Sequence, residues 1–266
     1  MSLKLTTAAI AAAMSISLLA AAGASAATEA GSKCQGNAPG GNLTAISTAN
    51  APGSPLPATI PAGGVITRWT YNTVPLPPGT FTTALKVFRR TGGEQFQVVA
   101  DSGFASLNGG LNTFSTRIPV QAGDLIGSFG QQAGTAFTII CTTSNAGDKA
   151  AIVEGNPSVG STATALGEGT GIQVPLTVSI EPDADNDGFG DETQDACPQS
   201  PAVQVACPPV TLSTSTQVKK GSVTVIVTSS TAAPVTVKGV AKLGKGRKAK
   251  LNGGTQNLVP GTLSKF

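Results

Sequence analysis

Oxygen-bearing side chains recur at regular intervals in one short stretch of this 266-residue chain. Asp183, Asp185 and Asp187 alternate with other residues, as do positions 1, 3 and 5 of a loop that curls around a cation. Gly188 then stands at position 6, where such a loop turns sharply, and the carbonyl group of Phe189 falls at position 7. This spacing predicts a metal site built from one continuous loop.

The types of ligand in this stretch indicate which metal it would hold. Asp191 adds a carboxylate at position 9, and the chain contains no histidine at all. Hard oxygen ligands without His or Cys favour Ca²⁺ over transition metals. Residues 181–195 carry seven acidic residues and no basic one, so their charges repel one another unless a cation binds. We expect calcium to draw the stretch into a defined joint; a solvated, flexible linker is the alternative.

Two known calcium motifs resemble this stretch to different extents. The likeness to a helix-loop-helix calcium loop ends at position 9, because position 12 is Gln194 instead of Glu. Residues 181–208 resemble the thrombospondin type 3 calcium repeat more closely, since the acidic run ends in Cys197-Pro198 and a second Cys-Pro follows at Cys207-Pro208. That resemblance implies a ligand set of Asp183, Asp185, Asp187, Phe189 through its backbone, Asp191 and Asp195.

The absence of histidine also limits the catalytic chemistry of the chain. It excludes Ser-His-Asp and Cys-His nucleophile systems and histidine metal sites. Glu94, Asp101 and Asp124 could include a pair of catalytic carboxylates, as in a hydrolase, but three scattered acids form no pattern. We therefore assign no catalytic residue and expect a protein that is not an enzyme.

The N-terminus predicts export from the cytoplasm. Residues 1–26 combine Lys4, an apolar run over 10–22 and the small-residue sequence Ala24-Ser25-Ala26, which is typical of a cleaved signal peptide. No other apolar stretch approaches the length of a membrane span. We expect a secreted, extracellular protein whose mature chain does not cross a membrane.

The four cysteines fit an oxidising compartment. Three pairings are possible, and the sequence does not select one. Locality favours Cys197 with Cys207, which leaves Cys34 with Cys141. Free thiols or a cysteine metal site are the alternatives, although no two cysteines are closely spaced.

Short apolar runs separated by Gly and Pro predict an all-β fold. For residues 27–180 we expect a jelly-roll-like β-sandwich, with residues 28–60 starting as loop or irregular edge and residues 155–171 forming a long surface loop. The strands expected there are 65–71, 85–89, 96–101, 113–120, 125–129, 136–141, 150–153 and 174–180.

Residues 209–266 predict a second, immunoglobulin-like β domain that lacks its closing strands, with the surest strands at 223–228 and 234–237. Residues 196–266 hold nine basic residues and no acidic one, and five of the nine cluster: Lys242, Lys245, Arg247, Lys248 and Lys250. A solvated hairpin face explains this cluster; attachment to an anionic cell-wall polymer is the functional alternative. No aromatic residue interleaves with the basic ones, so we expect no nucleic-acid partner.

The whole layout loosely resembles secreted bacterial proteins in which a β-sandwich, an acidic repeat and an immunoglobulin-like tail follow one another. This resemblance implies a modular protein of the cell surface or extracellular matrix, with a cell-wall polymer or polysaccharide as candidate partner. A carbohydrate-binding module is the alternative function. Trp69 and Tyr71 share one face of a predicted strand and could stack on sugars, although a Trp in a sandwich strand more often packs in the core, with Arg68 facing water.

Overall fold

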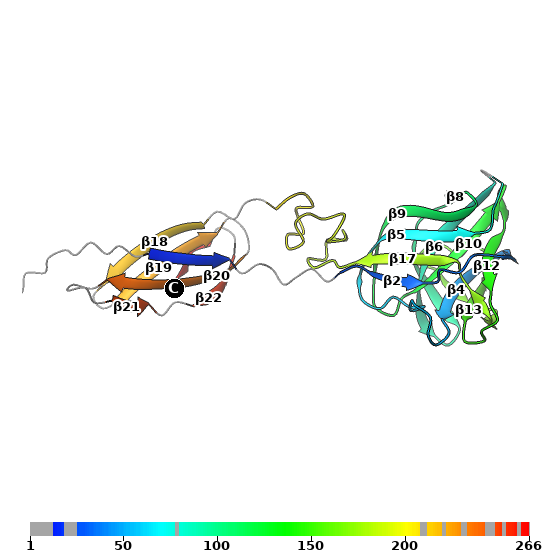
Figure 1. Ribbon diagram of the computed structural model, residues 1–266, viewed down its shortest axis with the longest axis horizontal. Coiled ribbons are helices and arrows are strands. Elements are labelled where there is room, and N and C mark those ends of the chain that lie inside the picture. Colours follow the sequence, from blue (N-terminus) through cyan, green and yellow to red (C-terminus); the bar gives the residue numbers. More distant parts are fainter. Residues whose placement is uncertain are drawn as a thin grey trace, which may run out of the picture. The chain divides into compact units, whose positions relative to one another are not determined.

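The computed structural model describes residues 13–18, 26–77, 80–207, 212–219, 222–229, 233–242, 248–251, 254–259 and 262–265. Every regular element in these ranges is a β-strand, which confirms the all-β class (Figure 1). The chain divides into two compact units. The first unit is Ala24–Cys207, and the second contains β1 and the strands that follow Pro208.

The first unit is sandwich-like and is built from three antiparallel sheets. The largest sheet has the strand order β14-β7-β6-β10-β4-β13-β15, with β8 beside β6 and β11 beside β10. Its strands are β4 (Leu43–Ala49), β6 (Phe81–Gly92), β7 (Gln95–Asp101), β8 (Ala105–Leu107), β10 (Leu125–Gln132), β11 (Thr135–Ala136), β13 (Lys149–Glu154), β14 (Thr162–Thr164) and β15 (Gly167–Thr170).

The two other sheets of this unit have the orders β2-β17-β5-β9 and β16-β12-β3. Their strands are β2 (Thr28–Gly31), β3 (Ala38–Gly41), β5 (Gly64–Thr73), β9 (Gly110–Val120), β12 (Thr138–Thr142), β16 (Ile172–Gln173) and β17 (Leu176–Glu181). β5 and β17 pair with each other, and β17 ends where the acidic stretch begins. These two strands therefore set the position at which that stretch leaves the sheet.

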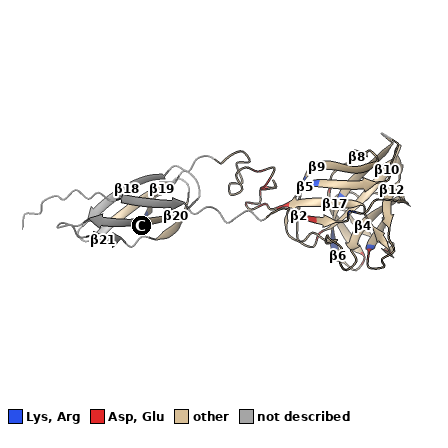
Figure 2. Ribbon diagram, viewed as in Figure 1, with Lys and Arg blue, Asp and Glu red and all other residues tan. Residues whose placement is uncertain are grey.

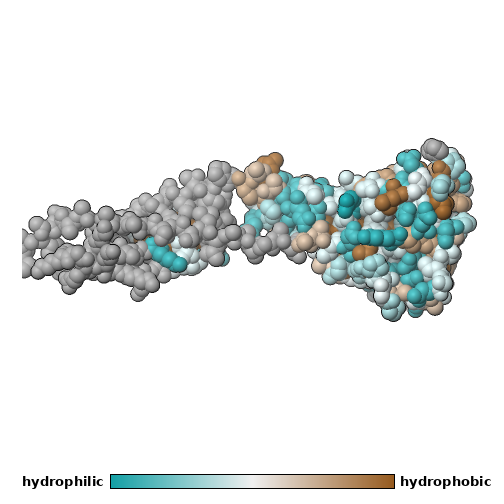
Figure 3. Space-filling model, in the orientation of Figure 1, coloured by the Kyte–Doolittle hydropathy of each residue, from teal (hydrophilic) through white to brown (hydrophobic). Residues whose placement is uncertain are grey.

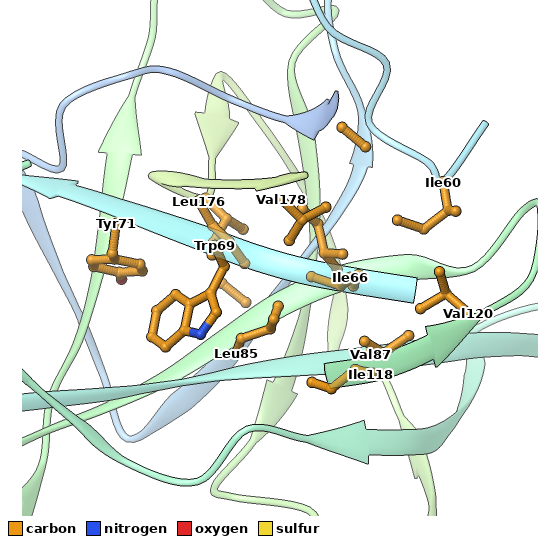
Figure 4. Packing of buried hydrophobic residues seen from close by; sticks show 14 of the residues in the cluster. Ile60, Ile66, Trp69, Tyr71, Leu85, Val87, Ile118, Val120, Leu176 and Val178 are labelled. Atoms are coloured by element: carbon orange, nitrogen blue, oxygen red, sulfur yellow. The ribbon is translucent and has the colours of Figure 1, made fainter. Parts of the chain in front are cut away.

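Burial along the strands follows their hydrophobic patterns. On β9 the side chains of Ile118 and Val120 are buried whereas those of Arg117 and Pro119, which alternate with them, are exposed. The main core is formed by buried residues of both large sheets, among them Ile66 and Trp69 of β5 and Leu85 of β6 (Figure 4). Central β6 is buried continuously from Thr83 to Phe88, because both of its faces are covered.

Two stretches predicted as loops contain strands. Within residues 28–60, β4 lies in the middle of the nine-stranded sheet, between β10 and β13. Its sequence is mostly Ala, Ser and Thr. The neighbouring strand β10 approaches it closely at Gly127, where a Cβ atom would lie 2.5 Å from the carbonyl oxygen of Ala45. Within residues 155–171, β14 and β15 form the two edges of the same sheet, and Ala163 and Ala165 pack into its second core.

The second unit has a small core between two sheets. The sheet orders are β1-β20-β21, with β22 also beside β20, and β18-β19-β23. The strands are β1 (Ala13–Leu18), β18 (Leu212–Lys219), β19 (Ser222–Ser229), β20 (Ala233–Lys242), β21 (Lys248–Leu251), β22 (Thr255–Leu258) and β23 (Ser264–Lys265). Alternate valines of β19 and β20 meet Leu258 in the core: Val225, Val227, Val235 and Val237.

Two sequence predictions fall partly outside the described residues. Of the expected signal sequence, residues 13–18 form β1, which runs antiparallel to β20 from Val235 to Val240, and Ala26 is also described. Of the basic cluster, Lys245 and Arg247 lie outside the described ranges, whereas Lys242 and Lys248 are opposite each other on β20 and β21. The described part of the chain contains no helix that is long and apolar enough to cross a membrane.

Candidate metal site

The acidic stretch is anchored to the first unit through Glu181, the last residue of β17. This carboxylate is only 3 % exposed. Its Oε1 accepts hydrogen bonds from the hydroxyls of Thr67 (2.8 Å) and Thr193 (2.7 Å), and its Oε2 accepts them from the backbone N–H groups of Glu192 (3.0 Å) and Thr193 (2.9 Å). Burial by itself would raise the pKa of Glu181, but these hydrogen bonds outweigh it and hold the pKa below its usual range.

Further contacts hold the same stretch against β5 and β9. The side-chain amide of Gln194 donates to the carbonyl oxygen of Thr116 at 2.7 Å, and the Arg117 guanidinium lies 4.0 Å from the centre of the Phe189 ring. Gly190 lies so close to the anchor that a Cβ atom would be 2.5 Å from Glu181 Oε2. The acidic stretch therefore packs against the strands of the first unit and is part of that unit, which extends to Cys207.

The first three aspartates of the stretch lie together. One carboxylate oxygen from each of Asp183, Asp185 and Asp187 lies within 4.8 Å of those of the other two, so the three could hold a metal ion. The backbone between them turns through the left-handed region at Asn186 (φ 60°) and Gly188 (φ 84°). Figure 2 shows acidic residues along the segment after β17.

Backbone N–H groups hold this curl in place. Asp183 accepts hydrogen bonds from the N–H groups of Asp187 and Gly188, both at 3.0 Å, and Asp187 accepts one from Phe189 at 2.8 Å. Bonds of this kind, from a carboxylate to N–H groups a few residues later, are the local alternative to regular structure that Asp favours. The loop that brings the three carboxylates together is thus built from its own sequence.

Asp191 and Asp195, which are also expected as ligands, lie outside this group of carboxylates within 4.8 Å of one another, and each is largely buried. Asp191 is 8 % exposed and accepts two 3.2 Å hydrogen bonds from the N–H of Ala184, whereas Asp195 is 3 % exposed. The Oδ1 atom of Asp195 accepts a hydrogen bond from the N–H of Cys197 at 2.7 Å. Its Oδ2 atom and Oδ2 of Asp185 are buried without a hydrogen-bond partner among the described residues. Such orphaned acceptors are costly, and a bound cation is one explanation for them.

The five aspartates also affect one another electrostatically. Burial raises the pKa of Asp185, and the neighbouring charges of Asp187, Asp195 and Asp183 raise it further. Burial likewise raises the pKa of Asp191, with additional contributions from Asp183, Asp195 and Asp185. The ion pairs found in the described ranges include none of the seven acids of residues 181–195. These acids therefore form a concentrated negative charge that no described Lys or Arg neutralises through an ion pair.

Two residues of the site were not anticipated from the sequence. Glu181 was counted only as one of the acidic charges, although it anchors the loop. Gln204 lies inside the Cys197–Cys207 loop and donates from its side-chain amide to Oδ2 of Asp187 at 2.8 Å. No local pattern marks Gln204, because its contact depends on how the disulfide loop folds back.

The structure pairs the cysteines as locality favours. Cys197 is bonded to Cys207, and Cys34 is bonded to Cys141, which ties the start of the first unit to β12. The four residues leave no free cysteine within the described ranges.

The side chains considered for sugar stacking are buried. Trp69 is 2 % exposed and Tyr71 is 1 % exposed, and both point into the main core (Figure 4). The Trp69 ring packs against Phe114 with 4.4 Å between ring centres, whereas Arg68 is exposed as predicted. Trp69 and Tyr71 therefore do not form a sugar-stacking platform on the surface.

The three scattered acids of the first unit are likewise separately engaged. Asp101 pairs with Lys86, Asp124 pairs with Arg89, and Glu94 is exposed. Large apolar side chains on the surface of the same unit are dispersed, and Figure 3 shows brown patches separated by teal on the face in view.

No protein-family model, curated protein or solved structure matches the chain.

Proposed function

We propose that residues 181–207 bind a calcium ion that fixes this segment onto the first unit. The observation that carries the proposal is the carboxylate of Asp195, which is almost fully buried, has one oxygen without a partner and has a charge that acts on Asp185 and Asp191. A buried, unpaired carboxylate is strongly unfavourable, whereas a divalent cation would satisfy it together with Oδ2 of Asp185.

Calcium fits the available ligands better than other common metals do. Five carboxylates from one stretch offer oxygen alone, and Ca²⁺ takes six to eight oxygen ligands in flexible geometry. The proposed ligands are the side chains of Asp183, Asp185, Asp187, Asp191 and Asp195 and the backbone carbonyl of Phe189, the set implied by the resemblance to a thrombospondin type 3 repeat. Magnesium demands a more regular octahedron and releases its water reluctantly, so it should bind more weakly.

The role we propose for the ion is structural. The segment is the last part of the first unit, so calcium would define the course of the chain up to Cys207. Two disulfides and the expected signal peptide support a secreted protein. We infer a non-enzymatic, modular protein that takes part in cell-surface or extracellular-matrix interactions.

Calorimetric titration of the mature chain with calcium tests the proposal. We expect wild type to bind calcium and Asp195→Asn to bind at least about tenfold more weakly, because one charged ligand is lost. Glu94→Gln, which removes an exposed acid elsewhere in the first unit, should bind as wild type does. Absence of calcium binding by wild type, or unchanged affinity in Asp195→Asn, would overturn the proposal.

A further inference from the structure

The loop closed by the Cys197–Cys207 disulfide contacts the acidic stretch at two of its carboxylates. From within that loop, the Gln204 amide donates to Asp187 Oδ2 at 2.8 Å. At the start of the loop, the N–H of Cys197 donates to Asp195 Oδ1 at 2.7 Å. Both carboxylates therefore take part of their orientation from a segment that supplies no carboxylate of its own.

A further hydrogen bond joins Gln204 to the residue that precedes this disulfide loop. The N–H of Ala196 donates to the carbonyl oxygen of Gln204 at 2.9 Å, which brings Gln204 back towards the acidic stretch. The disulfide joins residues ten positions apart and holds their Cα atoms 4.7 Å apart. Because the disulfide closes the loop, it limits the conformations in which Gln204 could leave Asp187.

Of the two carboxylates that the disulfide loop contacts, Asp195 keeps one oxygen free, whereas both oxygens of Asp187 accept hydrogen bonds. The Cys197 N–H engages Oδ1 of Asp195, and Oδ2 of the same carboxylate stays buried and unpartnered. Gln204 engages Oδ2 of Asp187, and the N–H of Phe189 engages Oδ1 of that side chain. A neutral amide donor stabilises a carboxylate without adding a competing positive charge, so the site keeps its full attraction for a cation.

The two cysteines of this disulfide differ in exposure. Cys197 is 3 % exposed, whereas Cys207 is exposed. Thiol–disulfide exchange begins with attack of a thiolate on an accessible sulfur, so Cys207 is the point at which a dithiol reductant can attack. In the other disulfide, Cys34 is half-buried and Cys141 is 1 % exposed.

We propose that the Cys197–Cys207 disulfide and Gln204 position the calcium ligands, so that reduction of this disulfide weakens calcium binding and calcium protects the disulfide. The inference rests on the proposed calcium function. In the reduction step, a dithiol donates two electrons and two protons: the Cys197–Cys207 bond breaks to give two thiols, and the reductant becomes a disulfide. Calcium takes no part in the electron transfer and acts only by binding the oxidised form more tightly.

Thermodynamic linkage makes the inference quantitative. The factor by which reduction raises the Kd for calcium must equal the factor by which saturating calcium lowers the equilibrium constant for reduction. Coupling between two sites is typically 5- to 150-fold, and about tenfold is expected here because the disulfide orients two ligands without supplying any.

Calcium titration of three variants of the full mature chain tests the positioning role. The double variant Cys197→Ser with Cys207→Ser and the variant Gln204→Met should each raise the calcium Kd about tenfold. Gln199→Met is the matched control, because Gln199 is exposed in the same loop and its side chain makes no hydrogen bond in the described structure; its Kd should equal that of wild type. Circular dichroism confirms that each variant keeps its β structure.

Redox titration of wild type provides an independent readout that a purely structural disulfide would not alter. Thiol labelling and mass spectrometry at Cys197 and Cys207, with and without calcium, should show reduction shifted towards stronger reductant by the same factor as the Kd. Wild-type calcium affinity in both the double variant and Gln204→Met would overturn the inference while leaving the proposed function intact. Absence of calcium binding by wild type would overturn both.

Discussion

Buried acids in two parts of the first unit are treated differently. In the sandwich body, Asp124 is 1 % exposed and accepts paired hydrogen bonds of 2.8 and 2.9 Å from Arg89. In the acidic loop, Asp195 is 3 % exposed, and no Lys or Arg in the described ranges pairs with it. Asp148 of the body is also buried without an ion pair in the described ranges, but hydrogen bonds from Ala51, Thr143 and Gln173 engage both of its oxygens. The comparison teaches that the body satisfies these buried acids with Arg89 or with hydrogen bonds, whereas Asp195 keeps one oxygen without a partner, which we propose a cation from solution fills.

The sequence explains the difference. Strand β6 carries both Lys86 and Arg89. The neighbouring acids Asp101 and Asp124 form ion pairs with them. Residues 181–195 contain no basic residue, and only hydrogen bonds from N–H, amide and hydroxyl groups reach their carboxylates. These bonds satisfy Glu181 but leave Asp185 and Asp195 each with one free buried oxygen.

The largest expected effect on stability comes from removing the buried carboxylate that pairs with Arg89 in the sandwich body. Asp124→Ala leaves the Arg89 guanidinium without its partner and removes the acceptor for the N–H of Gln121. Because the Arg89 side chain is 39 % exposed, the main cost is the loss of the hydrogen bonds to the buried carboxylate. We expect a loss of about 3 kcal/mol in the free energy of unfolding, equal with calcium and with chelator. Urea denaturation in both conditions measures it, with Glu94→Ala as the exposed control. A loss that depends on calcium would contradict the proposed separation between body and loop.

The effect of a substitution in the acidic loop on Tm should change sign when calcium is added. With chelator present, Asp185→Asn removes a charge that burial and neighbouring acids disfavour, so it should raise Tm. At a calcium concentration a hundredfold above the Kd, wild type gains about 2.7 kcal/mol, and the variant should lose most of this gain. Thermal melts in the two conditions show whether the order of the two proteins reverses. The same order in both conditions would refute the idea that calcium is the missing counter-charge.

Asp185 and Asp191 of the loop should change the stability of the fold with pH in the opposite direction to the anchoring residue Glu181. The raised pKa values of Asp185 and Asp191 mean that the folded chain holds their protons more tightly than the unfolded chain does. Their contribution to stability is therefore present below the unfolded pKa and is lost as pH rises through the raised folded pKa. The lowered pKa of Glu181 acts the other way, since its stabilisation is lost as pH falls through that value.

Protons compete with calcium for the carboxylates of Asp185 and Asp191, and their raised pKa values strengthen this competition, so the calcium-induced rise in Tm should be larger at pH 7 than at pH 5. Melts of wild type at a series of pH values, with and without calcium, measure this difference. Asp124→Asn should alter the baseline Tm but not the pH dependence of the calcium shift. An equal calcium shift at both pH values would show that these carboxylates are not ligands.

The smallest effect is expected at the contact between the loop and β9. Arg117→Ala removes the guanidinium from the face of the Phe189 ring and should cost about 0.5–1 kcal/mol. Phe189→Leu in the same background should then add little, because the two side chains act as one pair. A double-mutant cycle by chemical denaturation measures the coupling, and a coupling near zero would mean that this pair does not help to dock the loop.

The features that sequence predicted best are those encoded locally. Alternating Asp residues followed by Gly188 specify a curl within six residues, and the structure brings Asp183, Asp185 and Asp187 together. The eight apolar runs predicted as strands in the first unit all overlap observed strands, as for β5 and β10, whereas other strands there, such as β4 and β14, were not predicted.

The features that sequence missed depend on contacts between distant segments. Strand β4 is mostly Ala, Ser and Thr, so its pattern resembles a loop, and only its pairing with β10 and β13 makes it a strand. The anchoring bond between Glu181 and Thr67 joins residues 114 positions apart, and Gln204 reaches Asp187 only through the disulfide loop. No local pattern records these pairings, since they form only when the strands and the disulfide are in place.

The most direct test of the account is a thermal melt of the mature chain with excess calcium and then with chelator. We predict a calcium-dependent rise in Tm that disappears in the double variant Asp185→Ala with Asp187→Ala. An unchanged Tm, together with no calcium uptake by calorimetry, would contradict the account and would reduce residues 181–195 to an acidic segment held only by its own hydrogen bonds.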